Sequence, residues 1–166
     1  MKNVKTDKTG ALLLLGIGNN GRRDDGLGWR FTDMATGLRD PGLDCEYRYQ
    51  LQVEDVLPVC RHKKILFVDA THEELREGFV LRPCRAAPHY YYSSHMQSPE
   101  TILYLARELY HQEPEAWVLA ISGKNWGLGT KLSREAEDNL AKAFRYFKSE
   151  WLKGNLQQEG TVTGKS

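Results

Sequence analysis

The chain has few cysteines and no long apolar segment, and each shortage excludes a class of protein. Its 166 residues include only Cys45, Cys60 and Cys84. Because these form no C-x-x-C pair, neither a disulfide framework nor a thiolate zinc site is expected. No apolar run approaches the roughly 20 residues that cross a bilayer, so membrane insertion is not expected. A reducing compartment suits such a chain, and we expect a cytoplasmic location.

The sequence also lacks an excess of charge of either sign. It holds 23 Lys and Arg against 22 Asp and Glu, a formal net charge of +1. Because domains that bind nucleic acid are usually strongly basic, no nucleic-acid partner is expected. The length and the 40% hydrophobic content fit one globular domain. We place it at residues 11–153, between a disordered lead-in at 1–10 and a flexible tail at 154–166.

Familiar hydrolase signatures are missing as well. The serines lie in no G-x-S-x-G elbow, and the sequence contains no H-E-x-x-H helix. The three cysteines show no signature of a nucleophile. The usual serine, cysteine and zinc hydrolase arrangements are therefore not indicated.

Short apolar runs alternate instead with amphipathic helical patterns. Strands are expected at 11–17, 45–52, 63–70, 77–84 and 116–122, and helices at 27–38, 53–60, 98–110 and 136–151. This alternation predicts an α/β fold of three α/β/α layers with a central, mostly parallel twisted sheet of about five strands. The strand at 77–84 is expected at an edge. In such folds, ligands bind beyond the carboxyl ends of the strands.

A literal G-x-G-x-x-G stands at Gly16, Gly18 and Gly21, directly after the first strand. A dinucleotide fingerprint needs a helix to begin right after the third glycine, so that its N-terminus faces a pyrophosphate. Asp24 and Asp25 occupy that place, and the second strand does not end in a ribose-binding acid. A nucleotide-binding module is therefore the weaker interpretation.

Three polar residues at strand ends form a candidate metal site. Asp25 follows the first strand, Asp69 ends the strand at 63–70, and His95 precedes the helix at 98–110. Carboxylate and imidazole ligands suit nickel, zinc, iron or manganese, and three ligands leave positions open for a substrate. The spacing alone leaves this interpretation open.

Several neighbouring residues have structural interpretations. Asp24 is expected to be a helix-start residue, which the helix dipole favours. Arg22–Arg23 are expected to be solvated, and Trp126 to contact either a substrate or the core. His72 is a reserve ligand, as is His89. His62 has charged neighbours and is expected to be exposed.

The same segments resemble the maturation endopeptidases of [NiFe] hydrogenases. That family opens with a strand, then G-x-G-N, then D-[DE]-x-x-G; this chain has G-I-G-N at 16–19, D-D at 24–25 and Gly28. The aspartate that closes the third strand matches Asp69, and the histidine before a helix matches His95. The late segment "ISGKNWGLGTKLS" resembles the family's glycine-containing loop before its final helix. The resemblance extends from about Leu12 to Leu152.

The resemblance implies a metal-dependent endopeptidase that removes a short C-terminal extension from the nickel-loaded large-subunit precursor of a hydrogenase. The family's metal-binding positions map onto Asp25, Asp69 and His95, which are then both the metal ligands and the catalytic residues. Nickel is expected to arrive with the substrate protein, and other divalent cations could substitute. A metal held in this way can polarise a carbonyl or lower the pKa of a bound water. The implied partners are the precursor and its C-terminal peptide.

Two further interpretations stay open at this point. Peptidyl-tRNA hydrolases also carry a G-x-G-N loop, but they need a histidine and an asparagine shortly after it and a basic face. This chain has Asp24 and Asp25 there and is nearly neutral. The other alternative is a binding module, either for a nucleotide or as a docking factor that holds its partner without cutting it.

Overall fold

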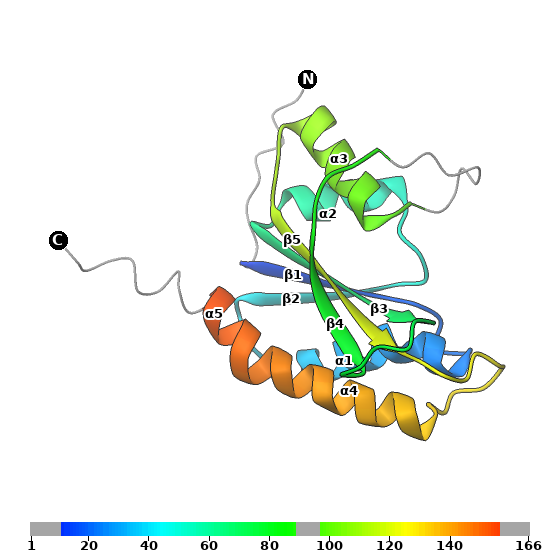
Figure 1. Ribbon diagram of the computed structural model, residues 1–166. Coiled ribbons are helices and arrows are strands. Elements are labelled where there is room, and N and C mark those ends of the chain that lie inside the picture. Colours follow the sequence, from blue (N-terminus) through cyan, green and yellow to red (C-terminus); the bar gives the residue numbers. More distant parts are fainter. Residues whose placement is uncertain (1–10, 89–96, 157–166) are drawn as a thin grey trace.

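Five strands form one sheet in the computed structural model, which describes residues 11–88 and 97–156 (Figure 1). The strands are β1 (Leu12–Ile17), β2 (Leu43–Arg48), β3 (Lys64–Thr71), β4 (Phe79–Cys84) and β5 (Glu115–Ser122). Their order is β2-β1-β3-β5-β4, with β4 antiparallel to β5 and the other pairs parallel. The predicted sheet is therefore confirmed, and so is its edge strand, β4.

Helices cover both faces of this sheet, which gives the expected three layers (Figure 1). The α-helices are α1 (Leu27–Thr36), α2 (Val56–Cys60), α3 (Pro99–Tyr110), α4 (Arg134–Tyr146) and α5 (Leu152–Leu156). Single turns, η1 (Arg23–Gly26), η2 (Val53–Asp55) and η3 (Phe147–Trp151), precede α1, α2 and α5. Helices α1 and α4 pack together on one face, and α2 and α3 on the other. Within the described ranges, no helix has the length and apolar character to span a membrane.

The central strand β1 has a continuous apolar sequence, and its position in the sheet explains this. All six of its residues are buried, because helices cover both sides of the sheet. Leu12 and Leu14 belong to the core on the α1–α4 side, whereas Leu13 and Leu15 belong to the core on the α2–α3 side. The carboxyl end of β1 therefore has a fixed position in the sheet.

Gly28 brings α1 into direct contact with the sheet. A Cβ atom at this position would clash with the main-chain oxygens of Ile17 and Val68, the latter at 2.6 Å. The glycine thus allows the start of the helix to approach the ends of β1 and β3. This close packing places the turn between β1 and α1 over the carboxyl edge of the sheet.

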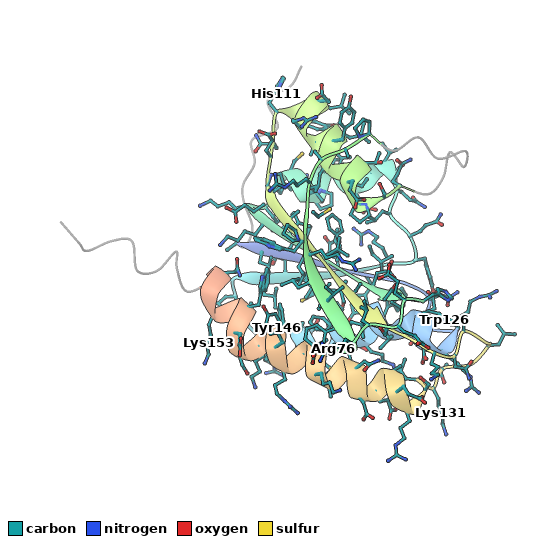
Figure 2. All side chains as sticks on the ribbon, viewed as in Figure 1. Arg76, His111, Trp126, Lys131, Tyr146 and Lys153 are labelled. Atoms are coloured by element: carbon teal, nitrogen blue, oxygen red, sulfur yellow. The ribbon has the colours of Figure 1, made fainter. Side chains whose placement is uncertain are left out.

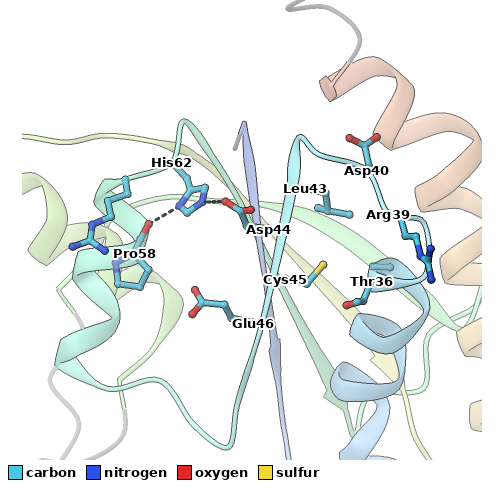
Figure 3. Close-up of a pocket in the computed structure, with 11 residues that line it drawn as sticks. Thr36, Arg39, Asp40, Leu43, Asp44, Cys45, Glu46, Pro58 and His62 are labelled. Atoms are coloured by element: carbon cyan, nitrogen blue, oxygen red, sulfur yellow. Dashed lines mark hydrogen bonds and ion pairs between the residues drawn. The ribbon is translucent and has the colours of Figure 1, made fainter. Parts of the chain in front are cut away.

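His62 is the clearest local difference from the sequence-based expectation. Its ring is buried instead of exposed, because both ring nitrogens have partners. Nδ1 lies 2.7 Å from the carbonyl oxygen of Pro58, and Nε2 lies 2.6 Å from a carboxylate oxygen of Asp44 (Figure 3). These residues line a cavity of about 490 Å³ beside the start of β2, at the amino end of that strand. The cavity is therefore remote from the candidate site described below.

Strand β2 also differs in its bounds. The pattern predicts a strand at 45–52, but the ladder with β1 runs from Leu43 to Arg48. Beyond it the chain bends, and Leu51 forms an isolated bridge with Gln97. The alternating polarity continues past the true strand end because Leu51 is buried in the core on the α2–α3 side.

Candidate active site

The turn after β1 fixes the position of Asp25. The backbone N–H of Asn19 donates both to the main-chain oxygen of Asp25 and to its carboxylate Oδ2, each at 3.1 Å. Gly18 has a φ of 145°, and a Cβ there would clash with the main-chain oxygen of Asp25. This part of the G-x-G-N motif therefore serves to hold an acidic residue at the carboxyl edge of the sheet.

Asp69 lies on the neighbouring strand, at the same edge of the sheet. Because side chains alternate along β3, Asp69 shares the α2–α3 side of the sheet with Phe67. Burial raises the pKa of Asp69 to about 7; the backbone N–H of Ala70 opposes this rise, and the negative charge of Asp25 adds to it. The structure thus brings Asp25 and Asp69 within electrostatic reach of each other.

His95, the third predicted ligand, lies outside the described residues, as does the reserve ligand His89. The described chain resumes at Gln97, whose N–H donates to the main-chain oxygen of Leu51. Ser98 then caps α3 by accepting a hydrogen bond from the N–H of Thr101. The assignment of His95 stays a prediction.

The two described acids fit a divalent cation. Within residues 11–88 and 97–156, no basic side chain forms a salt bridge with Asp25 or Asp69. Two carboxylates that are close together, one of them with a raised pKa, have negative charge that a bound cation would compensate. In the same ranges, no three His, Cys, Asp or Glu side chains lie together in a way that could hold an ion. The described chain therefore brings two carboxylates together at this edge, without a third such side chain in the same ranges.

Asp24 lies in the first turn of η1, as expected of a helix-start residue, but its side chain has a further role. Its side chain is fully buried and accepts hydrogen bonds from the loop between β5 and α4 rather than capping a helix. The donors are the N–H groups of Lys124, Asn125 and Ser133, each at 2.7 Å, and the Ser133 hydroxyl at 2.6 Å. Burial alone would raise the pKa of Asp24, but these hydrogen bonds outweigh it, and the pKa is lowered.

The loop between β5 and α4 forms one wall of this edge. Its Trp126 is partly buried and stacks on the exposed His72, with ring centroids 3.7 Å apart. Figure 2 shows Trp126 on the loop after β5, at the opposite end of the molecule from His111, which precedes that strand. Trp126 therefore lies at the rim of the sheet edge, partly exposed to solvent and stacked on His72.

Arg22–Arg23 join the turn to the same loop. Arg22 is exposed and forms a bridge with Gly129, while Arg23 is partly buried. The N–H of Arg23 donates to the carbonyl oxygen of Gly129 at 2.8 Å, and its Nε donates to that of Leu128 at 3.4 Å. The expectation that both arginines are merely solvated is thus wrong for Arg23.

Solved structures show which known architecture this is. The E. coli hydrogenase maturating endopeptidase HybD superposes with a TM-score of 0.69 at 15% identity, over 90% of this chain and 94% of its own. The chain has the fold of the [NiFe] hydrogenase maturation proteases. The maturation protease HycI from Thermococcus kodakarensis gives a TM-score of 0.65 at 20% identity, over 91% and 94% of the two chains.

A third maturation peptidase extends the comparison to another lineage. The hydrogenase 2 maturation peptidase from Thaumarchaeota archaeon SCGC_AB-539-E09 gives a TM-score of 0.60 at 17% identity, over 84% and 97% of the two chains. No protein-family model matches the sequence, and a comparison with curated proteins finds no relative. The motif-based resemblance to maturation proteases is thus confirmed in the fold, over nearly the whole described chain.

Proposed function

We propose that this chain is an endopeptidase that removes a C-terminal extension from the nickel-loaded large-subunit precursor of a [NiFe] hydrogenase in the cytoplasm. One observation carries the proposal: Asp25 and Asp69 come together at the carboxyl edge of a sheet that has the maturation-protease fold. The solved proteins with this fold are described as maturation endopeptidases and proteases.

The chemistry of these side chains supports a metal-centred recognition step. Asp25 and Asp69 offer hard oxygen ligands, and His95 would add a nitrogen ligand from the segment before α3. Nickel belongs to the substrate in this scheme, and it can polarise the scissile carbonyl or a water molecule. The protein's own contribution is to orient the two carboxylates. It also keeps Asp69 partly buried, so that a proton competes with the metal near neutral pH.

The decisive experiment is processing of the nickel-loaded precursor by the full-length chain, followed by intact-mass measurement of the precursor. We expect Asp25→Asn, Asp69→Asn and His95→Ala to lower the rate at least 100-fold while leaving the circular dichroism spectrum unchanged. Asp33→Asn is a matched control, since Asp33 is an acid on α1 whose carboxylate accepts from the Tyr47 hydroxyl. It should process the precursor normally.

The same measurement separates cleavage from docking. Loss of the C-terminal mass only when wild-type protein and nickel are both present supports an endopeptidase. A stable complex with a precursor of unchanged mass would overturn the proposal in favour of a docking factor. Full activity of both aspartate variants would overturn the assigned site.

A further inference from the structure

We propose that Asp24 is a positioning residue for the site. Its hydrogen bonds link the turn after β1 to the loop between β5 and α4, and this link holds Asp25 in place. This inference rests on the proposed function only for the role of Asp25 in metal recognition. The link between the two segments stands on its own contacts.

The carboxylate of Asp24 connects elements that are remote in sequence. Its Oδ2 accepts from the N–H groups of Lys124 and Asn125 and from the Ser133 hydroxyl, and its Oδ1 accepts from the N–H of Ser133. Its own N–H donates to the main-chain oxygen of Asn125 at 3.0 Å. Ser133 is also the N-cap of α4, since its hydroxyl accepts from the N–H of Ala136. One side chain thus joins the turn, the loop and the helix.

Asp25 is consequently held from two sides. On one side, Gly18 and Asn19 contact its main-chain oxygen, and Asn19 also contacts its carboxylate. On the other side, Asp24 is bonded to the loop at 124–133. A ligand that must meet a metal within a few tenths of an ångström requires this kind of support.

Backbone strain lies at the same point of the chain. Arg23 has a φ of 44°, in the left-handed region that non-glycine residues rarely adopt. Such a conformation persists only where surrounding contacts impose it, and such residues cluster at functional sites. Here the imposing contacts are the bond from the Arg23 N–H to Gly129 and those that Asp24 makes.

Only a carboxylate satisfies this arrangement. All the groups that face the Asp24 side chain in the printed hydrogen bonds are donors, and an ionised carboxylate is a pure acceptor. An asparagine would direct its amide N–H groups toward one or more of these donors. The isosteric Asp24→Asn substitution should therefore break the link without changing the volume of the residue.

The first test compares two N-cap serines, of which Ser133 donates a hydrogen bond to Asp24 and Ser98 caps α3 instead. Ser133→Ala and Ser98→Ala each remove an N-cap hydroxyl and should lower the melting temperature by a similar few degrees. Hydrogen exchange of the Asn19 amide, which is bonded to Asp25, reports the position of the turn. We expect this amide to exchange at least fivefold faster in Ser133→Ala and at the wild-type rate in Ser98→Ala. Ser133→Thr, which keeps the hydroxyl, should restore protection.

The second test measures the affinity of the full-length chain for Ni²⁺ by calorimetry. Residues that orient metal ligands typically change affinity by 10–100-fold, and we expect a loss of this size for Asp24→Asn but none for Asp33→Asn. A folded Asp24→Asn protein with unchanged Ni²⁺ affinity and unchanged Asn19 exchange would overturn the inference. If Asp24→Asn does not fold, equal Asn19 exchange rates in Ser133→Ala and wild type would overturn it.

These readouts also separate the inference from the proposed function. Absence of Ni²⁺ binding by the wild-type chain, together with normal processing by Asp25→Asn, would count against the proposed function. The Asn19 exchange comparison would still decide whether Asp24 holds Asp25, because it involves no metal.

Discussion

Trp126 lies flat against His72, with ring centroids 3.7 Å apart and ring planes inclined by 20°. The pair joins the loop after β5 to the segment after β3, and both segments follow strands that end at the candidate site. Gly123 lies beside the indole ring, since a Cβ atom at this position would come within 2.8 Å of the ring's Cη2 atom. The wall of the site therefore depends on a close contact between an aromatic ring and a glycine.

Gly123→Ala should destabilise the protein by about 1–3 kcal/mol, the usual cost of inserting a methyl group into a packed region. The added Cβ would lie 2.8 Å from both the Trp126 ring and the Cβ of Asp24, so one of them must move. Gly127→Ala is the matched control in the same loop, because its Cβ would meet only the Asn125 side chain at 3.4 Å. Urea unfolding should show a change below about 0.5 kcal/mol for the control.

Gly28→Ala and Gly154→Ala should act in opposite directions although both glycines are helical. At Gly28 the methyl group would clash with main-chain atoms of two strands, so we expect a loss above about 3 kcal/mol or a failure to fold. At Gly154 no atom of the described residues outside the adjoining helix backbone lies within 4 Å of the added Cβ, and alanine should stabilise α5 by about 0.5–1 kcal/mol. Thermal unfolding checks both, and equal effects would contradict the close packing at Gly28.

Asp69 should make the stability of the metal-free protein fall as the pH rises. Its pKa is about 7 in the folded chain and 3.8 in an unperturbed one, so between these values the folded state binds more protons than the unfolded state. The free energy of unfolding then decreases with pH, by at most about 1.4 kcal/mol per unit, and levels off above about pH 7. Asp69→Asn removes this dependence. The free energy of unfolding of the variant, relative to that of wild type, should therefore increase from pH 4 to pH 7. Parallel stability curves for the two proteins would contradict this prediction.

Asp25→Asn should lower the pKa of Asp69 from about 7, but not as far as its ordinary value of 3.8. Burial is the larger cause of the raised pKa, and it persists in the variant, whereas the repulsion from Asp25 is removed. Carbon NMR of the Asp69 carboxyl group through a pH titration measures the change. A pKa that does not move would mean that the two carboxylates are further apart than the structure places them.

Much of the fold could be predicted because its signals are local. The six-residue apolar run of β1 indicates a strand covered on both faces, and Ser98 followed by Pro99 marks the start of α3. The edge position of β4 also follows from its weaker apolar pattern. The place of Asp69 at the carboxyl end of β3 also follows from the sequence, because it closes a buried apolar run, whereas its role in the site stays a prediction.

The roles of Asp24 and His62 could not be predicted because their partners carry no sequence signal. Asp24 is held mainly by main-chain N–H groups 100 to 109 residues away, and any residue type except proline supplies such a group. His62 is buried because a carbonyl oxygen and a carboxylate happen to face its two ring nitrogens. Charged neighbours in the sequence say nothing about either contact.

The long separation between Asp24 and its donors also sets the order in which the protein matures during translation. The turn that bears Asp25 leaves the ribosome early, but the N–H groups that hold it are made 100 to 109 residues later. A nascent or truncated chain that ends before Lys124 therefore carries the acidic turn without the N–H groups that anchor it. Translation products that end before the loop between β5 and α4 should thus be inert.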